Sequence, residues 1–191
     1  MNRSRSPSVP HAPPPIRGAC AQDTQALHAL LLDTFERTWR AQLTPAAIQA
    51  YFRDRIAERY VEDHSGEFLV AEMHGRVIGM VHQRAGFIEA LHVLGACERR
   101  GLGRALMAAA EAQMRDRGVR RASLETDTFN LASQRFYEAL GYREAARYPD
   151  TEWNSGLTTI RYEKDLGDEN GIGALAADQP SPTTSTPLPG T

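Results

Sequence analysis

The sequence predicts one α/β domain, in which a mixed β-sheet carries helices on both faces. Runs that alternate between apolar and polar residues indicate strands, and apolar residues that recur every three or four positions indicate amphipathic helices. A strand, a helix and a second strand follow one another between residues 86 and 126, which is the order of a parallel βαβ unit with a right-handed crossover. A chain of 191 residues, of which 41% are hydrophobic, is long enough to bury one such core.

Both ends of the chain differ in composition from its middle. Residues 1–15 are rich in proline, serine and arginine, and residues 167–191 are rich in proline, threonine and serine. Such segments bury too little apolar surface to fold, so we expect two disordered tails. The globular domain is therefore expected to span residues 16–166.

The first half of this domain is expected to begin with a short strand at residues 16–19, followed by two helices. Asp23 precedes an apolar stripe over residues 24–39 and is a candidate N-cap for the first helix. The pair Thr44-Pro45 opens the second helix, because proline suits the first helical position. Apolar residues at four-residue spacing continue this second helix as far as Ile56.

The rest of the domain is expected to alternate between strands and helices. Two alternating runs flank His74-Gly75, which is typical of a β-hairpin. The remaining elements are expected at residues 86–95 (strand), 101–117 (helix), 119–126 (strand), 130–141 (helix) and 157–166 (strand).

Charge and composition exclude several classes of function. A net charge of −2 gives no reason to expect binding to nucleic acid or to a membrane surface. No apolar run is long enough for a transmembrane helix, and none follows the N-terminal arginines as a secretory signal requires. Cys20 and Cys97 are expected to be free thiols in a cytoplasmic protein. Because the six histidines include no HxxxH pair, we expect no metal site.

The stretch CERRGLGRAL, residues 97–106, combines bare backbone, positive charge and the start of a helix. The first N–H groups of a helix have no partner inside it and attract anions. Gly101 and Gly103 have no Cβ to keep an anion away, and the neighbouring arginines fit phosphate oxygens. The stretch lacks the GK(S/T) of a P-loop, and Leu106 stands where the dinucleotide fingerprint has a small residue. The predicted phosphate site consists of Arg99, Arg100, Gly101, Leu102, Gly103 and Arg104.

Two motifs together resemble the GCN5-related N-acetyltransferase (GNAT) superfamily. Gly101 and Gly103 fit its acetyl-CoA loop, (Q/R)xxGx(G/A), although Glu98 stands where the family has Gln or Arg. The later segment NLASQRFYEALGY, residues 130–142, fits the family pattern N..A..FY..LGF. The resemblance covers residues 16–166. It implies a mostly antiparallel sheet in which the two parallel strands, at residues 88–94 and 121–126, splay apart around the pantetheine arm of acetyl-CoA.

The resemblance also implies an activity and a cofactor site. The activity is direct transfer of an acetyl group from acetyl-CoA to a primary amine in a ternary complex, without a metal ion. The backbone of Leu91, His92 and Val93 would pair with the pantetheine arm, and one of its N–H groups would polarise the thioester carbonyl. The phosphate loop, together with Asn130, Ser133 and Tyr137, completes the expected cofactor-binding set.

Catalysis requires a base for the amine and an acid for the leaving sulfur. An ammonium group such as that of lysine has a pKa of about 10.4 and must lose a proton before it attacks. Glu89 is the first candidate base, and alternation places it on one strand face with Leu91 and Val93. Glu125 and Asp127, at the end of the neighbouring strand, are the alternatives. The candidate acid, by its place in the FY motif, is Tyr137, which could equally be a packing residue.

Several alternatives stay open at this point. A non-catalytic acyl-CoA sensor on the same fold would keep the phosphate loop, and a nucleic-acid binder would use the arginines, although the net charge and the lack of an aromatic-basic stripe disfavour it. The acceptor, a small-molecule amine or a peptide or protein amine, is not fixed by the sequence. A homodimer is expected from the family. Candidates for the acceptor pocket are Trp39, Tyr51, Phe52 and Trp153.

Overall fold

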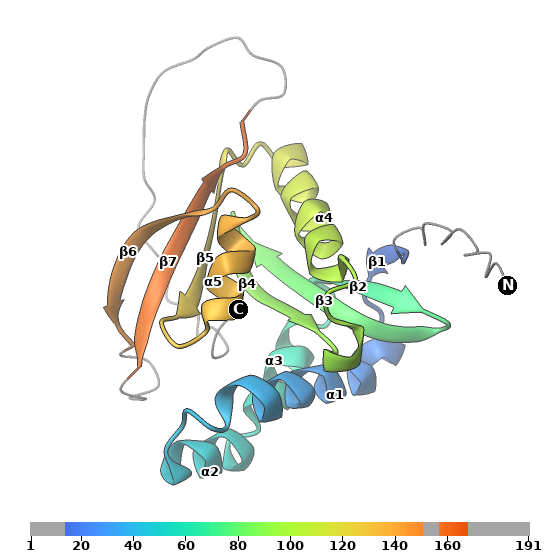
Figure 1. Ribbon diagram of the computed structural model, residues 1–191. Helices are drawn as coiled ribbons and strands as arrows, with labels where there is room; N and C mark the ends of the chain where they lie inside the picture. Colours follow the sequence, from blue (N-terminus) through green and yellow to red (C-terminus); the bar gives the residue numbers. More distant parts are fainter. Residues whose placement is uncertain (1–13, 151–156, 168–191) are drawn as a thin grey trace, which may run out of the picture.

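The computed structural model describes residues 14–150 and 157–167 of the chain, and these form a seven-stranded sheet (Figure 1). The strand order is β1-β2-β3-β4-β5-β7-β6, and neighbouring strands are antiparallel except for β4 and β5. The predicted fold class is thus confirmed. The strands are β1 (Ile16–Gly18), β2 (Phe68–Met73), β3 (Arg76–Arg84), β4 (Phe87–Val93), β5 (Arg121–Asp127), β6 (Arg143–Pro149) and β7 (Thr158–Asp165).

Helices cover both faces of the sheet and divide the core into two layers. One layer packs α1, α2 and α3 and the π-helical turn after α1 against side chains such as Met80 and Ala90. The other packs α4 and α5 against Ile78, Val81 and Ile88. The helical segments are α1 (Thr24–Thr34), the π-helical turn (Phe35–Trp39), α2 (Pro45–Arg53), α3 (Ile56–His64), α4 (Leu102–Asp116) and α5 (Leu131–Glu138).

The parallel strands β4 and β5 separate soon after they begin. Phe87 pairs with Ser123 and Ile88 with Leu124, and no further pair joins these two strands in the described chain. The predicted splay is therefore present. It leaves the C-terminal half of β4 facing a gap in the middle of the sheet, with α4 and α5 on one side (Figure 1).

Three local signals in the sequence produce the expected local structure. His74 and Gly75 both have positive φ angles, 52° and 72°, and form the tight turn of the β2–β3 hairpin. Thr44 Oγ1 accepts a hydrogen bond from the Ala47 N–H at the start of α2. Asn130 likewise accepts from the Ser133 N–H at the start of α5.

Asp23, the expected cap of α1, behaves differently. It precedes the helix, but its carboxylate accepts from the Cys20 N–H and from both terminal nitrogens of Arg17. The ion pair with Arg17 lowers the pKa of Asp23 below its ordinary range. This carboxylate therefore ties the start of α1 back to β1 and does not cap the helix.

Two sequence predictions of elements are wrong. The second predicted helix is two helices, because Arg55 takes a left-handed conformation with φ of 52° and ends α2 before α3 begins. The strand β6 was not predicted. Its side chains are nearly all exposed because it lies at the sheet edge, so it lacks the alternation that marks a half-buried strand.

A bulge in β4 changes the predicted alternation at Glu89. Gln83 of β3 faces Ile88 and His82 faces Ala90, so Glu89 is an extra residue without its own partner. Ile88 and Leu91 consequently pack on the α4 side of the sheet, while Ala90 packs on the α1–α3 side. The expectation that Glu89 shares a face with Leu91 is therefore wrong, and Glu89 lies instead on the α3 side.

In the part of the chain that the structure describes, no helix has the length and apolar character needed to cross a membrane. Both cysteines are free: Cys20 is exposed, and Cys97 is buried in the core beneath α4. The free thiols agree with the sequence prediction.

Candidate functional site

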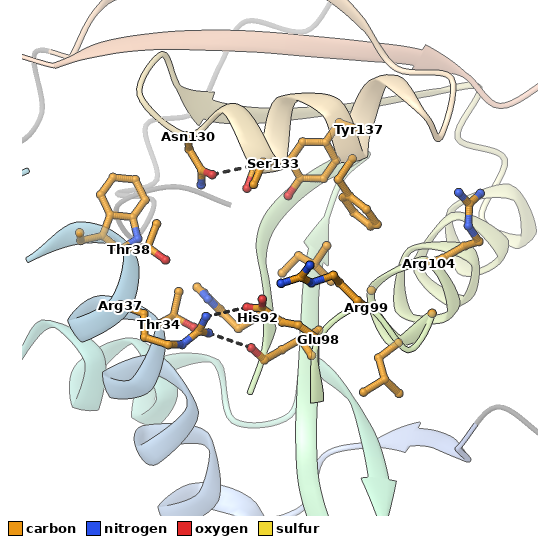
Figure 2. Close-up of a pocket in the computed structure, with 18 residues that line it drawn as sticks. Thr34, Arg37, Thr38, His92, Glu98, Arg99, Arg104, Asn130, Ser133 and Tyr137 are labelled. Atoms are coloured by element: carbon orange, nitrogen blue, oxygen red, sulfur yellow. Dashed lines mark hydrogen bonds and ion pairs between the residues drawn. The ribbon is translucent and has the colours of Figure 1, made fainter. Parts of the chain in front are cut away.

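A cavity of about 550 Å³ opens where β4 and β5 separate (Figure 2). Its walls come from the end of α1 and the following turn, from β4, from the loop before α4, and from α5. Eleven of the twelve predicted cofactor-binding residues line it: Leu91, His92, Val93, Arg99, Gly101, Leu102, Gly103, Arg104, Asn130, Ser133 and Tyr137. Arg100 and the candidate base Glu89 do not.

The loop before α4 is shaped by two residues with left-handed backbone. Gly101 has φ of 80° and sits at the N-cap of α4, and Arg99 has φ of 57°. Such turns point successive N–H groups toward one concavity, where an anion can be held. Gly103 also has a packing role: a Cβ there would lie 3.1 Å from the ring of Phe136, so its absence lets α4 and α5 approach each other.

Glu98, the residue that departs from the family loop, is paired. Arg37 Nη1 donates to Glu98 Oε1 at 2.6 Å, and Arg37 Nη2 donates to the Val93 carbonyl at 3.1 Å (Figure 2). Arg37 Nε also donates to Asp33, whose carboxylate accepts from the Gly95 N–H. A guanidinium from the π-helical turn thus offsets the negative charge that Glu98 adds to the phosphate loop.

His92 lines the cavity as a buried imidazole with unused hydrogen-bonding capacity. It is 4% exposed, and neither ring nitrogen has a hydrogen-bond partner among the described residues. Burial, and secondarily the charge of Arg37, lowers the pKa of His92 to about 4, so the ring is neutral near pH 7. Buried polar groups without partners are costly and rare in folded proteins. A ligand in the cavity would supply a partner.

Tyr137 combines a packed ring with a place on the cavity wall. It is 1% exposed, and its ring lies against those of Phe136 and Tyr142. Figure 2 shows its hydroxyl on the cavity side of α5. The packing role and the chemical role predicted for this residue are therefore compatible.

The three candidate bases are carboxylates outside the cavity lining. Glu89 is 8% exposed and accepts from Arg84 Nη2 at 3.3 Å; burial raises its pKa, and the positive Arg84 opposes this. Asp127 is 6% exposed, and burial, with the negative charges of Asp150 and Glu125 adding to it, raises its pKa to about 7. Glu125 is hydrogen-bonded to the Tyr148 hydroxyl.

The sequence of these elements matches a known family. Residues 24–142 match the model described as the acetyltransferase (GNAT) family. The chain belongs to this family. No curated protein matches the acetyltransferase in sequence.

Solved structures share the fold of this acetyltransferase at low sequence identity. The ribosomal-protein-S18-alanine N-acetyltransferase of Escherichia coli is 20% identical, with a TM-score of 0.60 over 83% of this chain and 99% of its own. The PaiA N-acetyltransferase of Thermoplasma acidophilum, in complex with coenzyme A, is 18% identical, with a TM-score of 0.63 over 79% and 98%. YncA of Salmonella typhimurium, solved with its cofactor acetyl-CoA, is 21% identical, with a TM-score of 0.59 over 86% and 100%.

The cofactor prediction agrees with these neighbours. Two of them were solved with coenzyme A or acetyl-CoA, and acetyl transfer in this family needs no metal ion. At the level of the family, the chain is an acyltransferase.

Sequence reasoning missed part of the cavity wall of the acetyltransferase. The residues it did not include are Thr34, Arg37, Thr38, Glu98, Ala132 and Phe136. Of the aromatic candidates for the acceptor pocket, Trp39 lines the cavity and packs edge-on against Phe129. Tyr51 stacks on Phe35 inside the helical layer, and Phe52 is exposed at 46%. Trp153 lies outside the described residues.

Proposed function

We propose that the protein transfers an acetyl group from acetyl-CoA directly to a primary amine. One observation carries this proposal: a single cavity joins the anion-binding start of α4, the open edge of the splayed strand β4 and the hydroxyl side of Tyr137. A simple anion site would need only the first of these features. A thioester substrate with a diphosphate at its far end uses all three.

The residues at hand fit acetyl-CoA. The N–H groups between Arg99 and Arg104 would hold the diphosphate, with the side chains of these two arginines in support. The backbone of β4 from Leu91 to Val93 would bind the pantetheine arm in the gap left by the splay. The unpaired ring of His92 supports this fit, because it is a buried polar group on the cavity wall that the folded chain leaves without a partner.

Tyr137 is proposed as the general acid. Acyl transfer needs a proton on the departing sulfur, and a phenol on the cavity wall can donate it. The surrounding rings of Phe136 and Tyr142 fix the orientation of the tyrosine. A proton donor held in one orientation loses little entropy at the moment of reaction.

Two buried carboxylates compete for the role of base. Glu89 is the residue to which the family resemblance points, but its carboxylate pairs with Arg84. Asp127 has a pKa of about 7, the value at which a base is both deprotonated and able to hold a proton near neutral pH. If Asp127 is the base, kcat/KM rises with pH through about 7 and Asp127→Asn abolishes that rise; if Glu89 is the base, Glu89→Gln has the larger effect.

One observation favours a second function, a non-catalytic acyl-CoA-binding module on the same fold. None of the three candidate bases lines the cavity, so an amine bound inside the cavity would have no carboxylate base among the lining residues that the sequence proposed. The deciding experiment is an acetyl-CoA consumption assay over small amines, polyamines, amino acids and peptides with free N-termini or lysines, with a no-acceptor control. Turnover with any amine above the control supports the transferase, whereas saturable acetyl-CoA binding with no turnover across the panel supports the binding module.

A further inference from the structure

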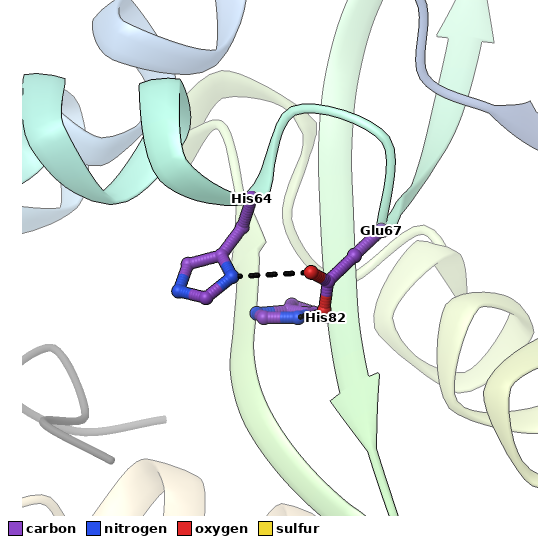
Figure 3. Close-up of side chains that lie close together, drawn as sticks. All are labelled: His64, Glu67 and His82. Carbon is purple, nitrogen blue, oxygen red and sulfur yellow. Dashed lines mark hydrogen bonds and ion pairs between the residues drawn. The ribbon is translucent and has the colours of Figure 1, made fainter.

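We propose that His64, Glu67 and His82 form a binding site for a divalent metal ion of the zinc class, separate from the acetyl-CoA cavity. The three side chains come from the end of α3, the turn after it, and β3, and they converge at one point (Figure 3). None of them lines the cavity at the splay. The site therefore goes beyond the proposed acetyl transfer and does not depend on it.

The spacing of the ligand atoms suits a small metal ion. His82 Nε2 lies 3.0 Å from Glu67 Oε2, and His64 Nδ1 lies 3.3 Å from Glu67 Oε1. Ligands at the usual zinc distances of about 2.0–2.1 Å in a tetrahedron are separated by about 3.3 Å. One ligand atom from each residue lies within 4.8 Å of the other two. Each histidine nitrogen thus lies beside a different oxygen of the same carboxylate, and the three side chains are within reach of one small ion.

The two ligands on the protein surface, His64 and Glu67, are the ones that can adjust to a metal ion. The His82 side chain is 1% exposed and fixed in the sheet, while Glu67 is 43% exposed and His64 19% exposed on the rim. Rotation of these two outer side chains can bring the three ligand atoms together around one ion.

A hydrogen bond with Tyr60 already orients the buried ligand His82. The Tyr60 hydroxyl and His82 Nδ1 are 2.6 Å apart, and Tyr60 is itself 7% exposed. Metal-binding histidines generally use their other ring nitrogen for such a contact, which fixes the tautomer and the ring plane. In the metal-free protein Nε2 donates to the Glu67 carboxylate, so Nδ1 accepts from the Tyr60 hydroxyl. When a metal ion takes the place of the Nε2 proton, the neutral ring carries its proton on Nδ1 and donates it to the Tyr60 oxygen.

The kinds of side chain also suit a cation. Two imidazoles and one carboxylate are a ligand set that zinc accepts. The HxxxH spacing does not describe this site, because its ligands are an HxxE pair and a histidine on β3, 15 residues after Glu67.

The test uses the full-length protein, with any affinity tag removed, stripped of metal with EDTA and free of acetyl-CoA. Zn²⁺ binding is measured by calorimetry and Co²⁺ binding by visible absorption. We expect one saturable site, tetrahedral Co²⁺ bands, and a rise in Tm of several degrees with Zn²⁺. His64→Gln and Glu67→Gln each remove one rim ligand and should weaken Zn²⁺ affinity more than about tenfold.

His74→Asn is the matched control, because His74 is an exposed histidine in the β2–β3 turn and Asn tolerates its positive φ. This variant should bind Zn²⁺ as the wild type does. His82 is left unchanged because its replacement would disturb the core. Absence of saturable binding in the wild type, or wild-type affinity in both rim variants, overturns the site; the latter would place the metal on other ligands. Neither result bears on acetyl transfer, which is measured separately.

Discussion

Arg37 and Glu98, 61 residues apart in the sequence, form an ion pair of 2.6 Å that joins the turn after α1 to the loop before α4. Both side chains are partly exposed, at 35% and 46%, so the pair contributes less than about 1 kcal/mol to stability. The ion pair matters more for the charge of the proposed acetyl-CoA site than for stability. It places a positive group beside the one carboxylate in a loop that is proposed to hold a diphosphate.

Replacement of Arg37 is expected to weaken acetyl-CoA binding through Glu98. In Arg37→Ala the carboxylate is left unpaired near the diphosphate, and the Kd should rise about tenfold, which corresponds to roughly 1.4 kcal/mol. Glu98→Gln alone should stay near the wild type. The double variant should recover most of the loss in calorimetry. A double variant as weak as Arg37→Ala would mean that Arg37 acts through its bond to Val93 and not through charge.

Tyr137→Phe tests the proposed acid. Loss of a general acid typically lowers the rate by about 10²–10⁴-fold, so kcat should fall by that order while the KM for acetyl-CoA changes little. Tyr162→Phe is the matched control, because Tyr162 belongs to the same ring cluster but its hydroxyl bonds Glu138 and it does not line the cavity. Equal kcat values for the two variants would assign Tyr137 to packing alone.

Gly103→Glu tests whether the loop before α4 holds the diphosphate of acetyl-CoA. The new side chain meets Phe136 at its Cβ and adds a negative charge beside the proposed diphosphate, so acetyl-CoA binding should be lost in calorimetry. Gly18→Glu is a control for the general effect of an added carboxylate, since nothing lies within 4 Å of a Cβ there. Retained affinity in a folded Gly103→Glu protein would contradict the assignment of this loop.

Asp127→Asn is expected to change how stability depends on pH. The folded pKa of Asp127, about 7, lies above the unfolded value, so the folded state holds the extra proton between pH 4 and 7. Ionisation of Asp127 therefore costs the wild type stability as the pH rises through this window. Asparagine cannot ionise, so the variant should gain roughly 2–4 kcal/mol relative to the wild type between pH 4.5 and 8. Urea unfolding of both proteins at the two pH values measures the difference in their free energies of unfolding. If this difference is the same at both pH values, Asp127 titrates normally.

Features encoded by neighbouring residues could be predicted from the sequence. The caps at Thr44 and Asn130, the His74-Gly75 turn and the glycine loop each depend on a few consecutive side chains or on a required backbone conformation. The same is true of the cavity, since all twelve expected cofactor residues lie on two continuous segments of the chain and eleven of them line the cavity.

Features that depend on distant contacts could not be predicted. Nothing near Glu98 indicates that Arg37 reaches it, and nothing near His82 indicates Glu67. Arg55 ends a helix in a left-handed conformation without the glycine that usually marks such a position. The two side-chain pairs form only when the folded chain brings distant segments together, so they have no local sequence signature.

The bulge in β4 makes Glu89 an extra residue that the pairing with β3 does not use. Since Ile88 faces Gln83 and Ala90 faces His82, a strand lacking Glu89 would keep the same partners in β3 and the same inward residues. The sheet does not require this position for its pairing or for either core. Glu89 is thus an inserted side chain, and changing it acts on its carboxylate and on the ion pair with Arg84 rather than on the strand pairing.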